Sequence, residues 1–192
     1  SFLVDSMFNR RGGCAANIAY NLALLSRRRS EGRPRIMATV GEDFAEYRAW
    51  LEAHGVDTSG IVTIENEFTA SFFVSTDRAN CQIASFYTGA MRKASQLSFY
   101  DGDYRHAEMA IISPNDPAAM VKYARECREL GIPYIYDPSQ QIIRLSTAEL
   151  EAGIDGSAAL IVNEYELEMI RRKTGLNEAD LLRLTEVLVV TR

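Results

Sequence analysis

The chain has 192 residues, 47% of them hydrophobic and 24% charged, which is the composition of a globular domain with a core of its own. A formal net charge of −5 argues against a general binder of nucleic acids or of anionic membranes. No apolar run reaches the roughly 18 residues that a membrane-spanning helix needs, and the three widely spaced cysteines are typical of reduced thiols, so we expect a cytoplasmic protein without a structural zinc site.

The chain begins with an apolar, strand-like segment over residues 1–8, and a glycine pair then opens a helix. Gly12 and Gly13 lead into an alanine-rich segment with no helix breaker, which predicts a tight turn followed by a helix over residues 14–25. One apolar stripe of this helix is expected to face a core: Ile18, Leu22 and Leu25. Glycine has no Cβ and a helix start presents unpaired N–H groups, so the turn suits a polyol or an anion, although a plain loop before a core helix has the same pattern.

Short apolar runs alternate with amphipathic segments through most of the remaining chain. The predicted strands cover residues 36–41, 109–113, 132–137, 158–162 and 187–191. The predicted helices begin at the capping residues Asp43, Asp116 (or Asn115), Ser146, Asn163 and Asn177. This order indicates an α/β protein with a mainly parallel sheet and helices on both of its faces.

One region interrupts the alternation, because residues 61–88 contain no helical pattern. Three extended segments rich in β-branched and aromatic residues cover residues 61–64, 69–76 and 81–87. Residues 77–80 have turn composition, which predicts a β-hairpin from the last two segments. We expect a small sheet laid over the rest of the protein.

In open parallel sheets the ligand lies beyond the carboxyl ends of the strands, so the residues that follow each strand matter. All five predicted strands are followed by polar residues, most of which include an amide or a carboxylate. Helix capping explains two of these polar residues, Asn163 and Asp116. It does not explain Gln140 and Gln141, which are poor caps after a proline turn and would offer donors and acceptors to a ligand rich in heteroatoms.

Several pieces spread over the whole chain belong together: residues 1–5, Arg11-Gly12-Gly13 with Asn17, residues 43–48, 82–87 and 137–141, and the pair Asn163-x-x-Glu166. In combination they resemble the ribokinase-like (PfkB) carbohydrate and nucleoside kinases, and within that family they are most similar to bacterial adenosine kinases. The resemblance implies a doubly wound ribokinase-like fold with a small β lid. The α/β core would comprise residues 12–61 and 90–192, incomplete at both ends, and the lid residues 1–11 and 62–89.

The resemblance also implies a nucleoside site. Its members are Ser1, Gly12, Gly13, Asn17, Phe72, Phe86, Gln140 and Gln141. In this family the positions of Gly13 and Asn17 bind ribose hydroxyls, and those of Phe72 and Phe86 hold the purine between aromatic rings. Ordinary packing of a β lid is the alternative explanation for the two aromatic side chains. Ser1 lies where the family contacts the base edge.

On the nucleotide side, the resemblance implies ATP and Mg²⁺ as cofactors. Asn163 and Glu166 match the pair that positions magnesium and the triphosphate, with Glu166 acting on the metal through water, and Thr191 lies on the strand end that lines the ATP side. The family's catalytic aspartate belongs to a glycine-rich segment that would lie beyond Arg192. We therefore expect the 192-residue chain by itself to be inactive.

The expected reaction of the parent protein is transfer of the γ-phosphoryl group of ATP to the 5′-hydroxyl of adenosine, which yields AMP. Two alternatives stay open. A sugar kinase of the same family, such as a ribokinase or fructokinase, would not need the two aromatic side chains, and a non-catalytic nucleoside-binding remnant would not need the catalytic segment. The oligomeric state also stays open, since lid strands pair between subunits in some members of the family and a homodimer is one arrangement.

Overall fold

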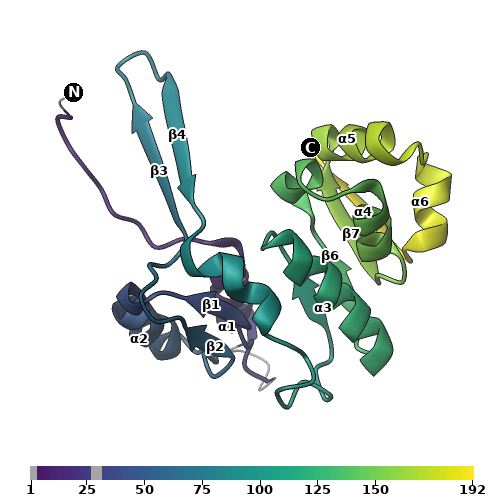
Figure 1. Cartoon of the computed structure of the whole chain (residues 1–192), viewed down its shortest axis with the longest axis horizontal. Coiled ribbons are helices and arrows are strands. Elements are labelled where there is room, and N and C mark those ends of the chain that lie inside the picture. The colour runs from purple at the N-terminus through teal and green to yellow at the C-terminus, as the bar shows by residue number, and fades with distance from the viewer. Residues whose placement is uncertain (1–3, 27–31) are drawn as a thin grey trace.

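The computed structural model describes residues 4–26 and 32–192, and it has two α/β parts, with a hairpin standing out from the first (Figure 1). The first part contains a parallel pair of strands, β1 (Ala38–Val40) and β2 (Ile61–Thr63). The second contains a parallel sheet in which sequential strands are neighbours: β5 (Ala110–Ile112), β6 (Tyr134–Tyr136), β7 (Ala159–Asn163) and β8 (Leu188–Thr191). The predicted alternating strands and their parallel direction are confirmed, but these strands form two separate sheets. The segment at residues 61–64, which we expected in the small overlying sheet, pairs with β1 instead.

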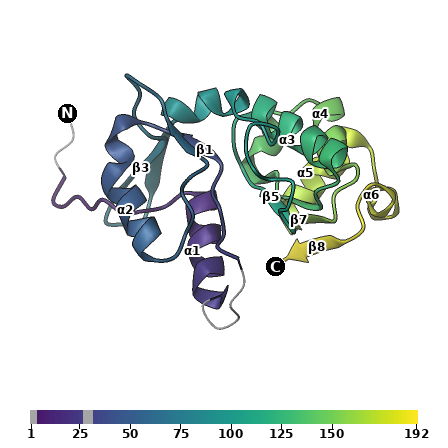
Figure 2. The same cartoon turned by 90° about the horizontal axis from the view of Figure 1, so that it is seen from below.

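Four helices connect the strands of the second part and supply the main core. They are α3 (Pro117–Leu130), α4 (Thr147–Ile154), α5 (Glu164–Thr174) and α6 (Glu178–Leu184). Right-handed crossovers between sequential neighbours return over the same face, so these helices pack on one face of the sheet (Figure 2). On that face Tyr134, Tyr136 and Leu160 are completely buried. The other face is more open, and Ile111 and Val189 there keep 38% and 37% of their surface exposed.

Local capping signals define the ends of these helices, as predicted. Asp116 accepts a hydrogen bond from the backbone N–H of Ala119 (3.2 Å), and reciprocal capping boxes close the starts of α4, α5 and α6. Gly131 and Gly175 end α3 and α5 with positive φ angles of 69° and 77°. Among the helices of the described ranges, none is long and apolar enough to cross a membrane.

In the first part, α1 (Cys14–Ser26) and α2 (Ala45–Ala53) share a core with the short sheet. The predicted inward stripe of α1 is wrong, because Leu22 and Leu25 keep 39% and 71% of their surface exposed and Ile18 is only half-buried. Ala19 and Ala23 face the core instead. An alanine stripe lets the helix backbone approach its neighbours more closely than a leucine stripe, and this tertiary fit selects the buried face.

The predicted strand over residues 1–8 is wrong for its described part. Residues 4–8 are exposed and form no strand. Asp5 instead makes an exposed ion pair with Arg78 at the tip of the hairpin (3.5 Å). A strand needs the backbone of a partner for its hydrogen bonds, and among the described residues none pairs with this segment.

The hairpin consists of the antiparallel strands β3 (Ser71–Thr76) and β4 (Gln82–Tyr87), joined by the predicted turn. Asp77 stabilises the turn, because its Oδ1 accepts hydrogen bonds from the N–H groups of Ala79 (2.8 Å) and Cys81 (2.9 Å). All side chains of residues 72–76 and 82–87 are exposed. Both faces of the hairpin are therefore open to solvent along its length, as its position in Figure 1 suggests.

The start of α2 differs from the prediction. A short 3₁₀ helix, η1 (Glu42–Phe44), precedes it, and no side chain caps the first N–H groups of α2. The predicted cap Asp43 accepts hydrogen bonds from Thr69 instead. A partner distant in sequence has thus replaced the local one, which a capping pattern does not reveal.

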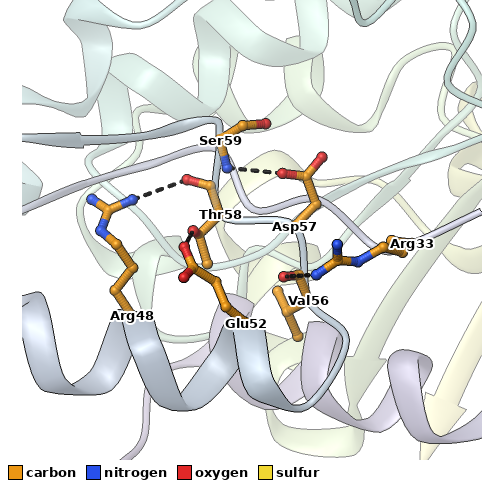
Figure 3. Close-up of a pocket in the computed structure, with 7 residues that line it drawn as sticks. All are labelled: Arg33, Arg48, Glu52, Val56, Asp57, Thr58 and Ser59. Atoms are coloured by element: carbon orange, nitrogen blue, oxygen red, sulfur yellow. Dashed lines mark hydrogen bonds between the residues drawn. The ribbon is translucent and has the colours of Figure 1, made fainter.

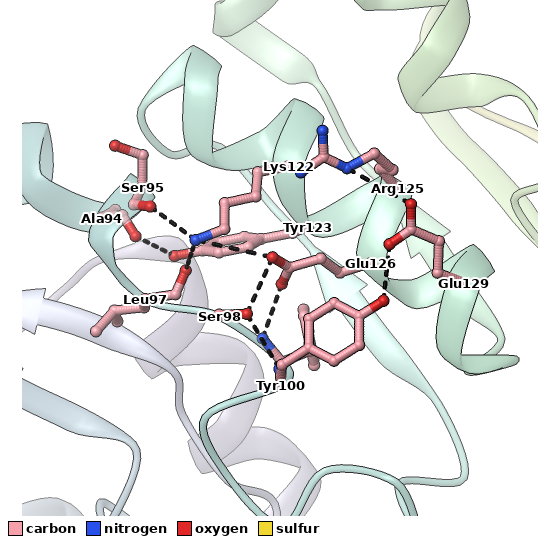
Figure 4. Close-up of polar contacts among 11 residues, drawn as sticks. Ala94, Ser95, Leu97, Ser98, Tyr100, Lys122, Tyr123, Arg125, Glu126 and Glu129 are labelled. Atoms are coloured by element: carbon pink, nitrogen blue, oxygen red, sulfur yellow. Dashed lines mark hydrogen bonds and ion pairs between the residues drawn. The ribbon is translucent and has the colours of Figure 1, made fainter.

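A 3₁₀ segment that no sequence pattern predicted, η2 (Gly89–Gln96), connects the hairpin to the second part. Figure 4 shows how α3 fastens this connector and the residues after it. Lys122 donates hydrogen bonds to the carbonyl oxygens of Ser95 (3.0 Å) and Leu97 (2.8 Å). Glu126, only 3% exposed, accepts one from the backbone N–H of Phe99 (2.8 Å). Because a buried carboxylate is tolerated only when it is paired and hydrogen-bonded, these contacts hold the connector on α3.

Candidate functional site

The carboxyl ends of β6, β7 and β8 bring several predicted site residues to one edge. Asn163 ends β7 and Thr191 ends β8, and the two lie opposite each other in the parallel ladder. Asp137 directly follows β6, the neighbour of β7 on the other side. Polar side chains from three adjacent strands therefore share the edge at which open α/β sheets bind ligands.

Glu166 is fixed at this edge by hydrogen bonds to both of its carboxylate oxygens. Its Oε2 accepts one from the N–H of Asn163 (2.8 Å), and the side-chain oxygen of Asn163 accepts one from the N–H of Glu166 (2.8 Å). Its Oε1 accepts one from the hydroxyl of Ser139 (3.0 Å), which belongs to η3 (Ser139–Ile143). The Asn-x-x-Glu pair is thus a capping box whose carboxylate has one orientation.

Asp137 is a residue of this edge that the sequence patterns did not single out. Burial, and after it the negative charge of Glu166, raise the pKa of its carboxyl from 3.8 to about 6. No described residue donates a hydrogen bond to this carboxylate. The sequence feature that could have identified it is an aspartate placed directly between an apolar strand and a proline loop. Two carboxylates that repel each other form an arrangement that a bound cation would stabilise.

The glycine turn before α1 is open to a ligand. Gly13 has a φ of +99°, which favours glycine, and its carbonyl accepts a hydrogen bond from the N–H of Asn17 (3.0 Å). A Cβ built on Gly12 or on Gly13 would meet no atom within 4 Å. The side chain of Asn17 is exposed and makes no hydrogen bond to the described residues. A ligand can therefore reach both the backbone of the turn and this amide.

An electrostatic interaction connects the glycine turn with the sheet edge, although the two belong to different parts of the molecule. Partial burial of the thiol raises the pKa of Cys14, even though the residue as a whole is exposed, and the negative charge of Asp137 raises it further. The charge of Asp137, in the loop after β6, therefore acts on the start of α1.

The two predicted glutamines lie side by side in η3 and differ in burial. Gln140 is exposed, whereas Gln141 is 4% exposed. The Oε1 atom of Gln141 is buried and accepts no hydrogen bond from the described residues. A buried acceptor without a donor costs free energy, so a donor on a bound molecule would stabilise this side chain.

Phe72 and Phe86 lie directly opposite each other in the hairpin, with their side chains on the same face. Their exposed fractions are 65% and 49%, so the pair forms an open aromatic surface. Among the described residues, no hydrogen bond or aromatic ring interaction joins this pair to Asn17 or to Gln141. The remaining predicted contact, Ser1, lies outside the described residues.

A polar pocket of about 510 Å³ lies elsewhere, between α2 and the loop that follows it (Figure 3). Its lining residues are Arg33, Arg48, Glu52, Val56, Asp57, Thr58 and Ser59. Both arginines donate hydrogen bonds to backbone carbonyl oxygens, Arg48 to Thr58 (3.1 Å) and Arg33 to Val56 (2.9 Å). None of the predicted site residues lines this pocket. Its two arginines bind backbone carbonyl oxygens, so we assign the pocket a structural role.

The sheet edge offers too few ligands for a closed metal centre. In the parts of the chain that the structure describes, no three His, Cys, Asp or Glu side chains are grouped to hold a metal ion. Mg²⁺ is commonly held by one or two carboxylates together with substrate phosphates, and it keeps several waters. Asp137 and Glu166 provide that number of carboxylates, so the residues present fit this cation.

The structure is thus that of an α/β protein with polar side chains at the carboxyl ends of its parallel strands and an open glycine turn before α1. Residues 2–192 match the sequence profile of the pfkB family carbohydrate kinases, and the chain belongs to that family. The nucleoside kinase of Methanothermobacter thermautotrophicus is 30% identical over 179 residues, which cover 92% of this chain and 56% of that protein. The chain therefore spans little more than half the length of this relative.

Solved structures place the fold in the same family. The nucleoside kinase of Burkholderia thailandensis in complex with inosine superposes with a TM-score of 0.87 and 32% identity, covering 100% of this chain and 61% of the other. The nucleoside kinase of Methanocaldococcus jannaschii, an archaeal member of the ribokinase family, gives a TM-score of 0.83 and 26% identity, covering 94% and 58%. The predicted family and the ribokinase-like α/β fold are confirmed.

Proposed function

We propose that the full-length protein is a nucleoside kinase, which transfers the γ-phosphoryl group of ATP to the 5′-hydroxyl of a nucleoside, with adenosine as the first expected substrate. The observation that carries the nucleoside part is the exposed aromatic pair of Phe72 and Phe86. Family membership and the similarity to nucleoside kinases support the kinase part. The inosine complex of the Burkholderia protein supports a purine riboside as the class of substrate.

Nucleoside binding would use the hairpin and the glycine turn. Stacking of a base on an aromatic ring contributes about 1–3 kcal/mol, and the two phenylalanines are exposed enough to provide it. The backbone of Gly12 and Gly13 and the amide of Asn17 would bind the ribose hydroxyls, because the turn is open and this amide has no other described partner.

The glutamines of η3 would complete the nucleoside site. Gln140 is exposed and offers both a donor and an acceptor. Gln141 would contribute its side-chain amide, whose Oε1 accepts no hydrogen bond from the described residues. We also propose that Ser1 contacts the edge of the base, and this role rests on the family resemblance alone.

Asn163, Glu166 and Thr191 would form the nucleotide side of the site. Bound Mg²⁺ would supply the positive charge that neutralises the phosphates during transfer. Glu166 would act through water, because both of its oxygens already accept hydrogen bonds that fix their direction. The half-buried carboxylate of Asp137 would gain a counter-charge there. Thr191 would line the ATP side, opposite Asn163 in the ladder.

We further propose that the hairpin acts as a lid over the nucleoside. The lid would comprise residues 1–11 and 62–89, and the core residues 12–61 and 90–192. Residues 62 and 63 still pair with β1, so the chain leaves the core just after them. The exposed hairpin then approaches the ligand as one unit, because its two strands are paired along their whole length.

We also propose a homodimer that forms through an edge of the hairpin. The hairpin has only two strands, so each has an unpaired edge, and such edges favour pairing with another chain. We place the protein in the cytoplasm, where ATP is available and the free thiols of its three cysteines persist.

Titration calorimetry on the full-length protein tests the nucleoside proposal. We expect adenosine and inosine to bind, and D-ribose and D-fructose to bind far more weakly, because the sugars have no base to stack on the aromatic pair. Binding of a sugar without binding of either nucleoside would contradict the proposal and favour the sugar kinase. Nucleoside binding without any phosphoryl transfer would favour the non-catalytic remnant.

A further inference from the structure

The foot of the hairpin, residues 64–70, is fastened to the loop that follows β1. Oδ1 of Asp43 accepts hydrogen bonds from both the N–H (2.8 Å) and the hydroxyl (2.7 Å) of Thr69. The same hydroxyl accepts a hydrogen bond from the N–H of Gly41 (3.0 Å). Thr69, two residues before β3, is thereby held by the backbone and a side chain of one loop.

Gly41 allows the two segments to touch backbone to backbone. A Cβ on Gly41 would lie 2.3 Å from the carbonyl oxygen of Glu67 and 2.4 Å from the nitrogen of Thr69. Its φ of −88° is an ordinary conformation for any residue, so glycine is needed here for space alone. Any side chain at this position would push the foot away from the loop.

Further contacts close the foot from both sides. The N–H of Glu42 donates to the carbonyl of Glu67 (3.1 Å), and Oε1 of Glu42 accepts from the N–H of Asn66 (3.1 Å). The N–H of Ala90, in η2, donates to the carbonyl of Phe68 (2.9 Å) where the chain returns from β4. The hairpin therefore leaves the core through an anchored base.

We propose that Asp43 is a positioning residue for the nucleoside site: through Thr69 it holds the hairpin at the angle that places Phe72 and Phe86 over the ligand. This inference rests on the proposed nucleoside function. Phe72 lies three residues beyond Thr69 along an extended strand, so a shift of the foot moves the aromatic pair directly. Asp43 itself caps no helix and contacts no predicted ligand group.

The test compares four variants of the full-length protein. Asp43→Ala removes both hydrogen bonds to Thr69, Thr69→Val removes those of the hydroxyl with little change in shape, and Asp43→Asn keeps the Oδ1 acceptor. Gly41→Ala keeps every polar group but displaces the foot. Asp101→Ala, an exposed aspartate in a surface turn, is the control. The readouts are KM and kcat for the nucleoside and hydrogen exchange of the β3 and β4 amides.

We expect Asp43→Ala, Thr69→Val and Gly41→Ala to raise KM for the nucleoside about three- to tenfold, with kcat at saturation and KM for ATP little changed. Exchange of the hairpin amides should accelerate in the same three variants. Asp43→Asn and Asp101→Ala should resemble the unmodified protein. If Asp43→Ala and Thr69→Val keep the original KM and exchange rates, the inference is wrong. If the unmodified protein binds no nucleoside, the proposed function fails, and the exchange rates still decide whether Asp43 anchors the hairpin.

Discussion

Asp137→Asn is expected to raise the free energy of unfolding of the metal-free chain by roughly 1–3 kcal/mol at pH 7. The half-buried carboxylate is ionised at that pH, and burial together with the charge of Glu166 makes the ionised form costly, which is why its pKa lies near 6. Asparagine has nearly the same shape and carries no charge. Chemical denaturation at pH 7 measures the difference, and Asp155→Asn, at an exposed position, is the control.

The same residue predicts a pH dependence with a definite sign. The folded-state pKa of about 6 lies above the ordinary value of 3.8, so between these values the folded chain binds more protons than the unfolded one. The contribution of Asp137 to stability therefore falls as the pH rises from about 4 to about 6. The stabilising effect of Asp137→Asn should be small near pH 4 and largest above pH 6. An effect that is equal at both ends would contradict the assignment.

The same substitution, Asp137→Asn, should impair the magnesium-dependent activity although it raises stability. If Asp137 and Glu166 hold the hydrated Mg²⁺ of the proposed reaction, the full-length variant should need about 10- to 100-fold more magnesium for half-maximal turnover. A gain in stability with a loss of metal response is the pattern of a residue kept for function at the expense of the fold. Unchanged magnesium dependence would remove Asp137 from the site.

Phe72→Ala and Phe86→Ala should each weaken nucleoside binding by about 1–3 kcal/mol, the contribution of one aromatic stacking contact. The stability of the fold should hardly change, because both side chains are largely exposed in the absence of ligand. Phe73→Ala is the matched control, since Phe73 is adjacent in the strand, similarly exposed at 61%, and points to the opposite face.

Calorimetric titration with adenosine separates the three variants. The stacking proposal requires that the two variants of the pair lose affinity and that Phe73→Ala does not. Equal losses at all three positions would indicate a general disturbance of the hairpin. Full affinity in Phe86→Ala would refute its stacking role.

Local signals in the sequence were sufficient for most helices and strands. The helix from Asp116 to Gly131 has a cap, an apolar stripe and a terminating glycine within one short segment, and the structure confirms each of them. The turn at residues 77–80 is likewise local, because Asp77 bonds to backbone groups a few residues away. Such elements depend little on the rest of the fold.

The predictions were wrong where the local structure depends on a partner that is distant in the sequence. Asp43 has the position of a helix cap, but Thr69 offers it two donors from 26 residues away. The leucine stripe of α1 is as regular as its alanine stripe, and only the packing of the first part shows that Ala19 and Ala23 are buried. Residues 89–96 have no side-chain cap at their start, and η2 was not predicted.

The candidate site also contains features that local patterns predict and features that only the tertiary structure reveals. Asn163 was predicted as a helix cap, and the structure confirms this role and adds Glu166 as its partner in a capping box. The burial of Asp137 and its electrostatic effect on Cys14 depend on tertiary structure, and no pattern within either segment encodes them. The nucleoside roles of Phe72 and Phe86 stay predictions, supported by their pairing on one face.

A coupled ADP-release assay on the full-length gene product tests the central claim most directly. With ATP and Mg²⁺ present, we expect turnover with adenosine or another purine nucleoside and little with D-ribose or D-fructose. Turnover with a sugar but with no nucleoside would contradict the claim, and so would the absence of turnover with every one of these substrates.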